Sequence, residues 1–345
     1  MTVTQMDVAA RAGVARKTVS NVINDYPHVS DDVRERVLQA IKELDYRPNH
    51  AARSLRSGRT RVIGLAVPEL DVSYFAELAR LVVEVAQERG LTVMIMQTLG
   101  DAARELDVVN GTYTQFVEGM IYSPVSVSGA ELEKRRDRTP IVLLGERSTA
   151  GLVDHVGIDN VAAARKATAH LVEIGRRRIA FLGTQRTASE IARLRVTGYE
   201  EALRAAGLPV DAGLIVPTAA YHRSDGVVAM RNLLDRPGPR PDAVFCATDL
   251  LAQAGIRVLL ERGLRVPEDV AVVGFDDADE GRYSTPTLTT ISPDKRQIAE
   301  IAVTRLLARS DSKKDLPVED TVTDFSLVVR ESTAGRSPGS PPRTS

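Results

Sequence analysis

The sequence has little cysteine, little histidine and no long apolar run. Its 345 residues include one cysteine, Cys246, so no disulfide can form within the chain and no cluster of thiolates can hold a metal. The five histidines are scattered, and no pair has the spacing of metal ligands. We therefore expect no metal and no cofactor, and we expect a protein of the reducing cytoplasm.

Membrane and export segments are also missing. No apolar run reaches the roughly 18 residues that a membrane span needs, and the first residues lack the basic-then-apolar order of a secretion signal. The hydrophobic share of 43% and the charged share of 26% are ordinary for a globular protein. We expect no membrane partner, and the length predicts two or three domains.

Charge is unevenly distributed along the chain. Residues 1–60 contain ten Lys or Arg and seven Asp or Glu, a net charge of +3, so the remainder carries −4. The segment 46–61 holds five arginines and no acidic residue. A small basic segment ahead of a mildly acidic body indicates a polyanionic partner for the first segment only.

Three short helices are predicted within the first 45 residues. The first carries its apolar residues at helical spacing and ends at Gly13; they are Met6, Val8, Ala9 and Ala12. The second turns Val19, Val22 and Ile23 toward a core and stops before Pro27. Ser30 is suited to cap the third, whose buried stripe is predicted to be Val33, Val37, Leu38, Ile41 and Leu44.

Two short helices joined by a turn containing glycine, with a third helix across them, form a helix-turn-helix that reads the DNA major groove. Arg16 and Lys17 can donate to guanine, and Asn21 can pair with adenine. Thr4, Thr18 and Ser20 suit phosphate contacts, and Asn24 lies on the same surface. The alternative is that the basic residues are only a solvated helix end.

The segment 46–59 is predicted to be a linker. After Pro48 it can form one short helix that Asn49 caps and Gly58 ends. About eight residues are too few for a stable helix alone in water, so we expect the linker to be flexible until a partner orders it.

From residue 60 onward, short apolar runs alternate with amphipathic stretches. Predicted strands are 62–67, 91–96, 118–123, 140–145, 177–183, 213–218, 242–248 and 269–277, and predicted helices lie between them. Such alternation predicts an α/β fold with two lobes, each a parallel sheet flanked by helices. The later segment 287–310 adds a strand and a helix that we expect to return to the first lobe.

A ligand of parallel sheets sits beyond the carboxyl ends of their strands, and in two lobes those ends face one cleft. Side chains near the predicted strand ends and helix starts are Tyr74, Phe75, Ser123, Arg195, Tyr221, Asp249 and Asp276. Carboxylates and an arginine suit the binding of sugar hydroxyls, and an aromatic face can stack on a sugar ring. For Asp249 the alternative is a helix cap, and for Tyr74 and Phe75 it is packing.

The order of several segments resembles the lactose-repressor and galactose-repressor (LacI/GalR) family of bacterial transcription regulators. The segments are DVAARAGVARKTVSNVIND, VSDDVRERVLQAIKELDYRPNHAARSLRSG, IGLAVPELDVSYFAEL, GIDN, ARLRVTGY, CATDLLAQAG, VPEDVAVVGFDD and PTLTTI. They occur in one order over nearly the whole chain. The resemblance therefore implies a helix-turn-helix headpiece followed by a two-lobed core like that of periplasmic binding proteins.

The resemblance also implies roles for individual residues. Arg16, Lys17 and Asn21 would read bases, and the linker would fold into a hinge helix on DNA, with Asn49 and Arg53 as contacts. Leu55 would wedge into a base step of the minor groove; the alternative is an ordinary apolar linker residue. The implied effector contacts are the seven side chains near the strand ends and helix starts, most directly Arg195, Asp249 and Asp276.

These inferences predict a repressor that binds a palindromic operator as a homodimer and responds to a small effector, a mono- or disaccharide, which releases the DNA. A solute receptor without a DNA role is the alternative, and an enzyme is disfavoured because the motifs GxxxxGK[ST], HExxH and GxSxG are missing from the chain.

The predicted domains are a headpiece at 1–45, a hinge at 46–59, a core at 60–333 and a disordered tail at 334–345. Lobe 1 would span about 60–158 plus 290–320, and lobe 2 about 159–289 plus 321–333. The tail is rich in Pro, Gly and Ser and has no leucine heptad, so we expect a dimer and no larger assembly.

Overall fold

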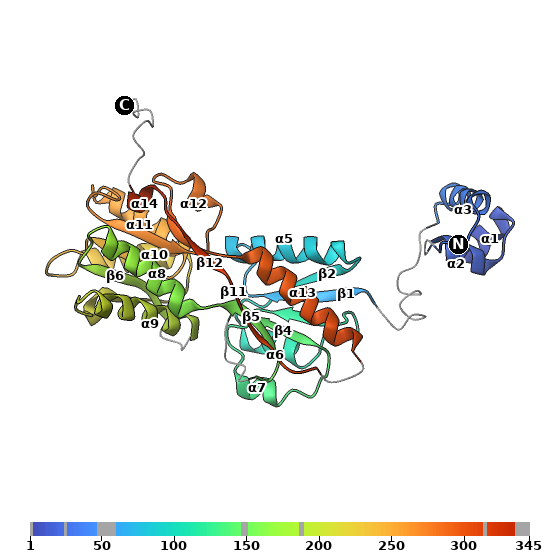
Figure 1. The fold of residues 1–345 in the computed structure, drawn as a ribbon, viewed down its shortest axis with the longest axis horizontal. Coiled ribbons are helices and arrows are strands. Elements are labelled where there is room, and N and C mark those ends of the chain that lie inside the picture. Colours follow the sequence, from blue (N-terminus) through green and yellow to red (C-terminus); the bar gives the residue numbers. More distant parts are fainter. Residues whose placement is uncertain are drawn as a thin grey trace, which may run out of the picture. The chain divides into compact units, whose positions relative to one another are not determined.

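The computed structural model describes residues 3–23, 26–46, 60–145, 151–185, 190–312 and 316–334. The chain divides into two compact units, Met1–Arg61 and Val62–Ser345. Each unit has its own hydrophobic core. Figure 1 shows the helices and strands of both units.

The first unit contains the three predicted helices, α1 (Gln5–Ala12), α2 (Arg16–Ile23) and α3 (Asp31–Glu43). Thr4 caps α1 in a reciprocal arrangement with Asp7, and Gly13 ends the helix in the left-handed conformation, with φ of 67°. Val8, Val19 and Val37 have no exposed surface and form the centre of the core.

Two residues predicted to lie in this core are exposed. Leu38 is 53% exposed because it follows Val37 directly, and successive helical residues point about 100° apart. Ala40, one turn after Val37, occupies the core face instead. Met6 is 66% exposed because it lies in the first turn of α1, where side chains tilt toward the helix start and beyond the core.

The second unit consists of two lobes, each with a six-stranded sheet between helices (Figure 1). The sheet of lobe 1 has the order β11-β5-β4-β3-β1-β2 and is parallel throughout. Its strands are β1 (Val62–Val67), β2 (Thr92–Gln97), β3 (Met120–Tyr122), β4 (Ile141–Leu144), β5 (Asp154–Ile158) and β11 (Asp320–Thr323). Its helices are α5 (Ser73–Glu88), α6 (Ala102–Val109), α7 (Gly129–Glu133) and α13 (Lys295–Asp311).

The sheet of lobe 2 has the order β12-β10-β9-β8-β6-β7, and only β12 is antiparallel to its neighbour. Its strands are β6 (Ile179–Gln185), β7 (Ile215–Thr218), β8 (Ala243–Cys246), β9 (Ala271–Phe275), β10 (Thr289–Pro293) and β12 (Phe325–Val328). Its helices are α8 (Asn160–Glu173), α9 (Glu190–Ala205), α10 (Arg223–Leu234), α11 (Asp249–Glu261), α12 (Glu280–Tyr283) and α14 (Glu331–Ala334), with a short 3₁₀ turn at Ala212–Leu214.

The chain crosses between the lobes at other positions than predicted. Strand β10 pairs with β9 and belongs to lobe 2, although residues 290–293 were assigned to lobe 1. Residues 321–323 pair with β5 in lobe 1, although they were assigned to lobe 2. Helix α13 lies in lobe 1 as predicted and contacts α5. The difference arises because backbone pairing, which the apolar pattern does not reveal, decides the sheet to which a strand belongs.

Several further elements differ from the sequence prediction. β5 and α8 were not predicted, because β5 begins with the polar pair Asp154 and His155, both of which are buried. Strand β2 was predicted to be buried, but its residues are half-buried or exposed because it forms an edge of its sheet. Within the described residues, no helix is both long and apolar enough to cross a membrane.

Candidate effector site and DNA-binding interface

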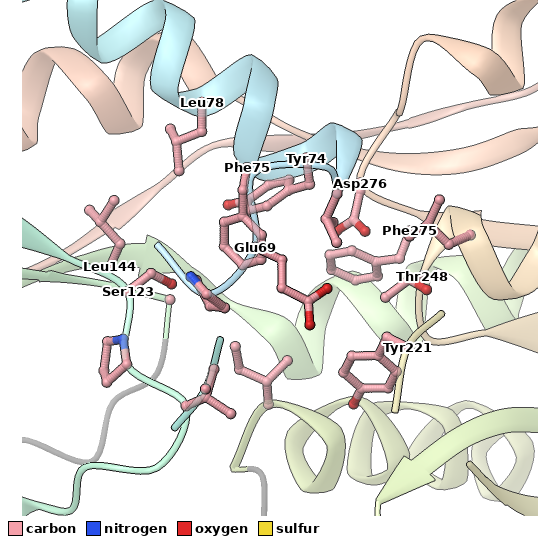
Figure 2. A pocket seen from close by; sticks show the side chains of 18 of the residues that line it. Glu69, Tyr74, Phe75, Leu78, Ser123, Leu144, Tyr221, Thr248, Phe275 and Asp276 are labelled. Atoms are coloured by element: carbon pink, nitrogen blue, oxygen red, sulfur yellow. The ribbon is translucent and has the colours of Figure 1, made fainter. Parts of the chain in front are cut away.

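A cavity of about 650 Å³ lies between the two lobes at the carboxyl ends of their strands. Its volume is in the range that binds small molecules. Side chains from both lobes line it (Figure 2). The polar ones are Glu69, Ser123, Ser126, Asn160, Gln185, Arg195, His222, Thr248 and Asp276, and the aromatic ones are Tyr74, Phe75, Tyr221 and Phe275. Six of the seven predicted effector contacts are therefore brought together.

Arg195, on α9, is held in one orientation by its surroundings. It is 7% exposed, its Nε donates to Asn160 Oδ1 at 2.9 Å, and its Nη1 donates to the carbonyl oxygen of Ala247. The guanidinium carbon lies 3.4 Å from the centroid of the Phe275 ring, a stacking arrangement that arginine favours. These contacts leave the rest of the planar guanidinium for a ligand in the cavity.

Asp276 follows β9 directly and lines the cavity beside Tyr74 of lobe 1 (Figure 2). Its φ of 113° lies in a region that residues other than glycine rarely adopt, at a cost of about 1–3 kcal/mol. Burial raises the pKa of its carboxyl group to about 6, although the charges of Arg195 and Lys295 oppose the rise. Within the described residues its carboxylate has no hydrogen-bond partner, so its acceptor capacity is left for a ligand.

Tyr74 and Phe75, at the start of α5, form one wall of the cavity (Figure 2). Tyr74 and Phe75 contact each other edge to face, with ring centroids 5.2 Å apart. Burial, and to a smaller extent the charge of Asp276, raise the pKa of the Tyr74 hydroxyl. Both rings also pack against the main core, so the packing interpretation is confirmed, and contact with a ligand stays a prediction for these two residues.

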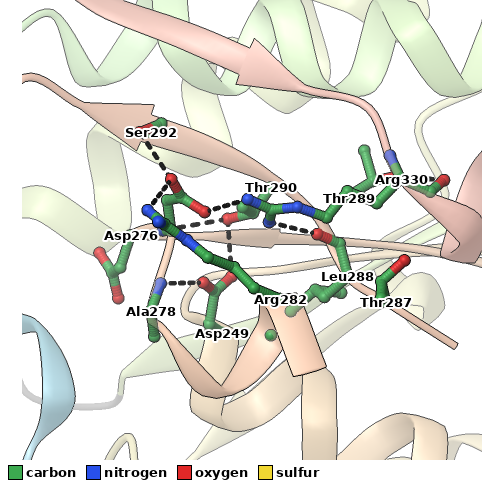
Figure 3. A network of polar contacts seen from close by, with 12 residues as sticks. Asp249, Asp276, Ala278, Arg282, Thr287, Leu288, Thr289, Thr290, Ser292 and Arg330 are labelled. Atoms are coloured by element: carbon green, nitrogen blue, oxygen red, sulfur yellow. Dashed lines mark hydrogen bonds and ion pairs between the residues drawn. The ribbon is translucent and has the colours of Figure 1, made fainter. Parts of the chain in front are cut away.

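Asp249 is the one predicted contact that does not line the cavity. It is 1% exposed, and its carboxylate accepts from the Ala278 amide at 2.8 Å and from Thr290 Oγ1 at 2.6 Å (Figure 3). Burial and the charge of Asp276 raise its pKa well above the usual value. The helix-cap alternative is also wrong, because Thr248 caps α11 by accepting from the Leu251 amide.

Several lining residues were not among the predicted contacts. Glu69 lies two residues beyond β1, and Thr248 lies two residues beyond β8. Both therefore fit the expectation that ligand contacts lie just beyond the carboxyl ends of parallel strands. Gln185 ends a strand that extends two residues further than predicted. Asn160 begins α8, which was not predicted, and His222 precedes α10. Asn160 lies in the family segment GIDN, which was not interpreted as a ligand contact, whereas no sequence signal distinguished His222 from other polar residues.

Side chains also connect the lobes around the cavity. Lys295 of lobe 1 donates to the carbonyl oxygens of Asp276 and Asp277 in lobe 2, at 2.7 and 3.1 Å, and pairs with Glu77 of its own lobe. Ser73 of lobe 1 donates to Glu280 of lobe 2. Glu69 lies 3.5 Å from His222 across the cleft. The lobes are therefore held by contacts that a ligand between them can reinforce or replace.

Asp277 anchors the backbone next to Asp276. Its carboxylate accepts from Arg330 at 2.6 Å, from Arg282 at 2.9 Å and from Ser292 at 3.1 Å (Figure 3). Burial favours the neutral acid, but the bond and charge of Arg330 outweigh it and lower the pKa of Asp277. The neighbouring carboxyl groups thus differ: Asp277 is fully paired, whereas Asp276 faces the cavity.

The first unit presents the predicted DNA-reading helix. Arg16 and Lys17 are exposed at the start of α2, and Thr18, Ser20 and Asn21 are half-buried on the same helix. Helix α2 has no acidic residue. Thr4 is exposed, but its hydroxyl is already bound to Asp7 at the cap of α1. Asn24, Asn49, Arg53 and Leu55 lie outside the described residues.

Comparison with known proteins agrees with the division of the chain into a helical first unit and a two-lobed second unit. Residues 4–49 match the model of the bacterial regulatory proteins of the lacI family, and residues 168–333 match the periplasmic binding protein-like domain. The match at 4–49 argues against a solute receptor without a DNA role. Within the described residues, no group of three or more His, Cys, Asp or Glu side chains is arranged to hold a metal ion.

Curated relatives and solved structures match over nearly the full chain. The HTH-type transcriptional regulator CelR of Thermobifida fusca is 38% identical over 94% of this chain and 96% of its own length. The ribose operon repressor of Escherichia coli K12 is 34% identical over 89% and 92%. The lac repressor dimer bound to operator and an anti-inducer is 27% identical, with a TM-score of 0.81 over 96% of this chain and 99% of that one. These relatives are transcriptional regulators rather than enzymes, and the chain belongs with them to the LacI family of DNA-binding bacterial regulatory proteins.

Proposed function

We propose that this regulator is a homodimeric repressor that releases a palindromic operator when a sugar binds between its two lobes. The observation that carries the proposal is the convergence of Asp276 and Arg195 on one cavity, each with hydrogen-bonding capacity directed at a ligand. A carboxylate that accepts and a guanidinium that donates bind adjacent hydroxyls of a sugar, and an aromatic wall stacks on its apolar face.

Two relatives support a sugar as the effector class. A structure of CelR with cellobiose is 35% identical to this chain, with a TM-score of 0.71 over 96% of it. The ribose operon repressor is named for a sugar as well. The cavity of this chain offers the chemistry that such ligands need.

Control of DNA binding follows from the position of the cavity between the lobes. A ligand that contacts both lobes favours one lobe arrangement, and in a dimer that arrangement decides whether the two hinge segments can pair on DNA. Such coupling is typically about 1–3 kcal/mol. We propose that Arg16, Lys17 and Asn21 read bases, that Thr4, Thr18, Ser20 and Asn24 contact the backbone, and that the hinge contributes Asn49, Arg53 and Leu55.

The test is operator binding measured by fluorescence anisotropy, with palindromic promoter fragments and a panel of mono- and disaccharides. One sugar should release the operator at a concentration that also stabilises the protein against heat. In Asp276→Asn the operator affinity should persist while the sugar response falls. Binding to random duplex as tightly as to any palindrome would contradict the DNA half of the proposal, and a normal response in the variant would contradict the site.

A further inference from the structure

The lining residue Glu69 contacts His222 across the cleft and has so far been given no part in ligand binding. We propose that Glu69 makes the cleft select an uncharged sugar of two rings, because its carboxylate divides the cavity into two halves and binds hydroxyls where the rings meet. This inference rests on the proposed function and names the ligand class of the same site.

Glu69 has a central position in the cavity (Figure 2). It lies in the loop after β1, two residues beyond the strand, and its carboxylate points into the middle of the cavity (Figure 2). On one side of it lie Thr248, Phe275 and Asp276, and on the other lie Ser123 and Leu144 (Figure 2). A single ring bound at Asp276 and Arg195 fills only the first half.

The second half of the cavity suits another sugar ring. Its described walls come from the end of β4 and from the loop that follows β3, with the hydroxyls of Ser123 and Ser126 beside the apolar surfaces of Pro124 and Leu144. Sugar rings present polar edges and apolar faces, and this mixture of groups matches both. The full cavity of about 650 Å³ is larger than one ring requires.

The charges of the side chains that line the cavity disfavour an anionic ligand. Among the described lining residues, the acidic ones are Glu69 and Asp276 and the one arginine is Arg195, and no lysine lines the cavity. Arg195 already donates to Asn160 and Ala247. The ammonium group of Lys295 donates hydrogen bonds to Glu77 and to main-chain carbonyl oxygens. Among the described residues, a phosphorylated or otherwise anionic ligand would therefore face two carboxylates, part of the Arg195 guanidinium, and a His222 side chain that already lies beside Glu69.

In the part of the chain that the structure describes, the one side chain that pairs with Glu69 is His222 of lobe 2, whose Nε2 lies 3.5 Å from the carboxylate, and both side chains are partly exposed. That distance is too long for a strong hydrogen bond, so ligand hydroxyls can take its place without leaving a buried charge unpaired. The carboxylate accepts two or more such bonds.

The loop offers a matched control. Asp71 lies two residues after Glu69, is exposed, and is not among the residues that line the cavity. Asp71→Asn removes the same charge as Glu69→Gln from the same loop. Comparing the two variants therefore separates ligand contact from a general change in loop charge.

The experiment is isothermal titration of the full chain with cellobiose, maltose, lactose and trehalose, with glucose, galactose and ribose, and with glucose 6-phosphate. We expect one neutral disaccharide to bind at least tenfold more tightly than any monosaccharide, and glucose 6-phosphate to bind more weakly than glucose. Glu69→Gln should weaken the disaccharide about tenfold and the monosaccharide less than threefold, and Asp71→Asn should change neither.

Three results would overturn the inference alone: a monosaccharide that binds as tightly as the best disaccharide, glucose 6-phosphate that binds more tightly than glucose, or equal losses for both ligands in Glu69→Gln. Equal losses would indicate that Glu69 acts only through His222 on lobe contact. In each case a lost response in Asp276→Asn would leave the sugar-controlled repressor intact. If no sugar binds, both proposals fail.

Discussion

Lys295 of lobe 1 donates a hydrogen bond of 2.7 Å to the main-chain carbonyl of Asp276 in lobe 2. The Lys295 side chain is 5% exposed, and its ammonium group also pairs with Glu77. Asp276, which faces the cavity, is therefore held at its backbone by the opposite lobe, so movement of the lobes and the shape of the cavity are physically connected.

Replacing Lys295 with Met should weaken this connection. The apolar stem is kept and the ammonium is lost, so the carbonyls of Asp276 and Asp277 lose their donor. We expect the free energy of unfolding to fall by about 1–3 kcal/mol, measured by urea denaturation. In Arg80→Met, which breaks the exposed pair with Glu84 on α5, the loss should be below about 0.5 kcal/mol. Equal losses in the two variants would show that Lys295 does not join the lobes.

Asp276 should make stability depend on pH. Its pKa in the folded, ligand-free protein is raised to about 6, whereas an unfolded aspartate titrates near about 3.9. The folded state binds more protons in that window, so its stability should fall as pH rises from about 4 through 6. Asp276→Asn cannot ionise and should be more stable than the parent at pH 7, on the order of 1–3 kcal/mol, with no gain near pH 4. Thermal unfolding across this pH range checks the prediction, Asp71→Asn is the control, and a pH profile identical to the parent's would refute it.

Gly198 marks the closest approach of α9 to α8. A Cβ atom there would lie 2.1 Å from the carbonyl oxygen of Val161 and 2.8 Å from the amide of Arg165, both backbone atoms of α8. Gly198→Ala should therefore force the helices apart and cost about 1–3 kcal/mol in urea denaturation, although alanine favours helices. Arg204→Ala on the exposed side of α9 should stay within about 0.5 kcal/mol. A more stable Gly198→Ala variant would mean that the helices are less closely packed than described.

Lys17 should read one operator base. In Lys17→Ala, preference at a single position of each half-site should relax by about 1–3 kcal/mol, measured by anisotropy on a set of single-substitution operators. Lys42→Ala removes the same charge from an exposed position on α3 and should leave the order of preferences unchanged. Equal weakening of every sequence by Lys17→Ala would instead indicate a phosphate contact.

Local features of the fold were predictable because neighbouring residues decide them. The end of α1 at Gly13 follows from a left-handed cap, and the bounds of α2 follow from apolar spacing. The exposed Leu38 shows the limit of this reasoning, because Val37 and Leu38 are equally apolar and only packing of α3 against α1 and α2 selects one of them.

The same limit applies to the site. The residue types near the strand ends and helix starts predicted a polar cavity, and six of seven candidates line it. Asp249 was chosen by the same rule, yet Thr290 and the Ala278 amide turn its carboxylate into the protein. Both partners lie far along the chain from Asp249, so no local sequence pattern predicts these two hydrogen bonds.

Alternating apolar runs, a basic first segment and family motifs depend on local order, and they were enough to identify the kind of protein. That β10 joins lobe 2, that Lys295 reaches across to Asp276, and that Glu69 points into the cavity could be learned from the folded chain alone. These features are pairings between segments that are distant in the chain. Such pairings are selected by the geometry of packing, which side-chain type alone does not encode.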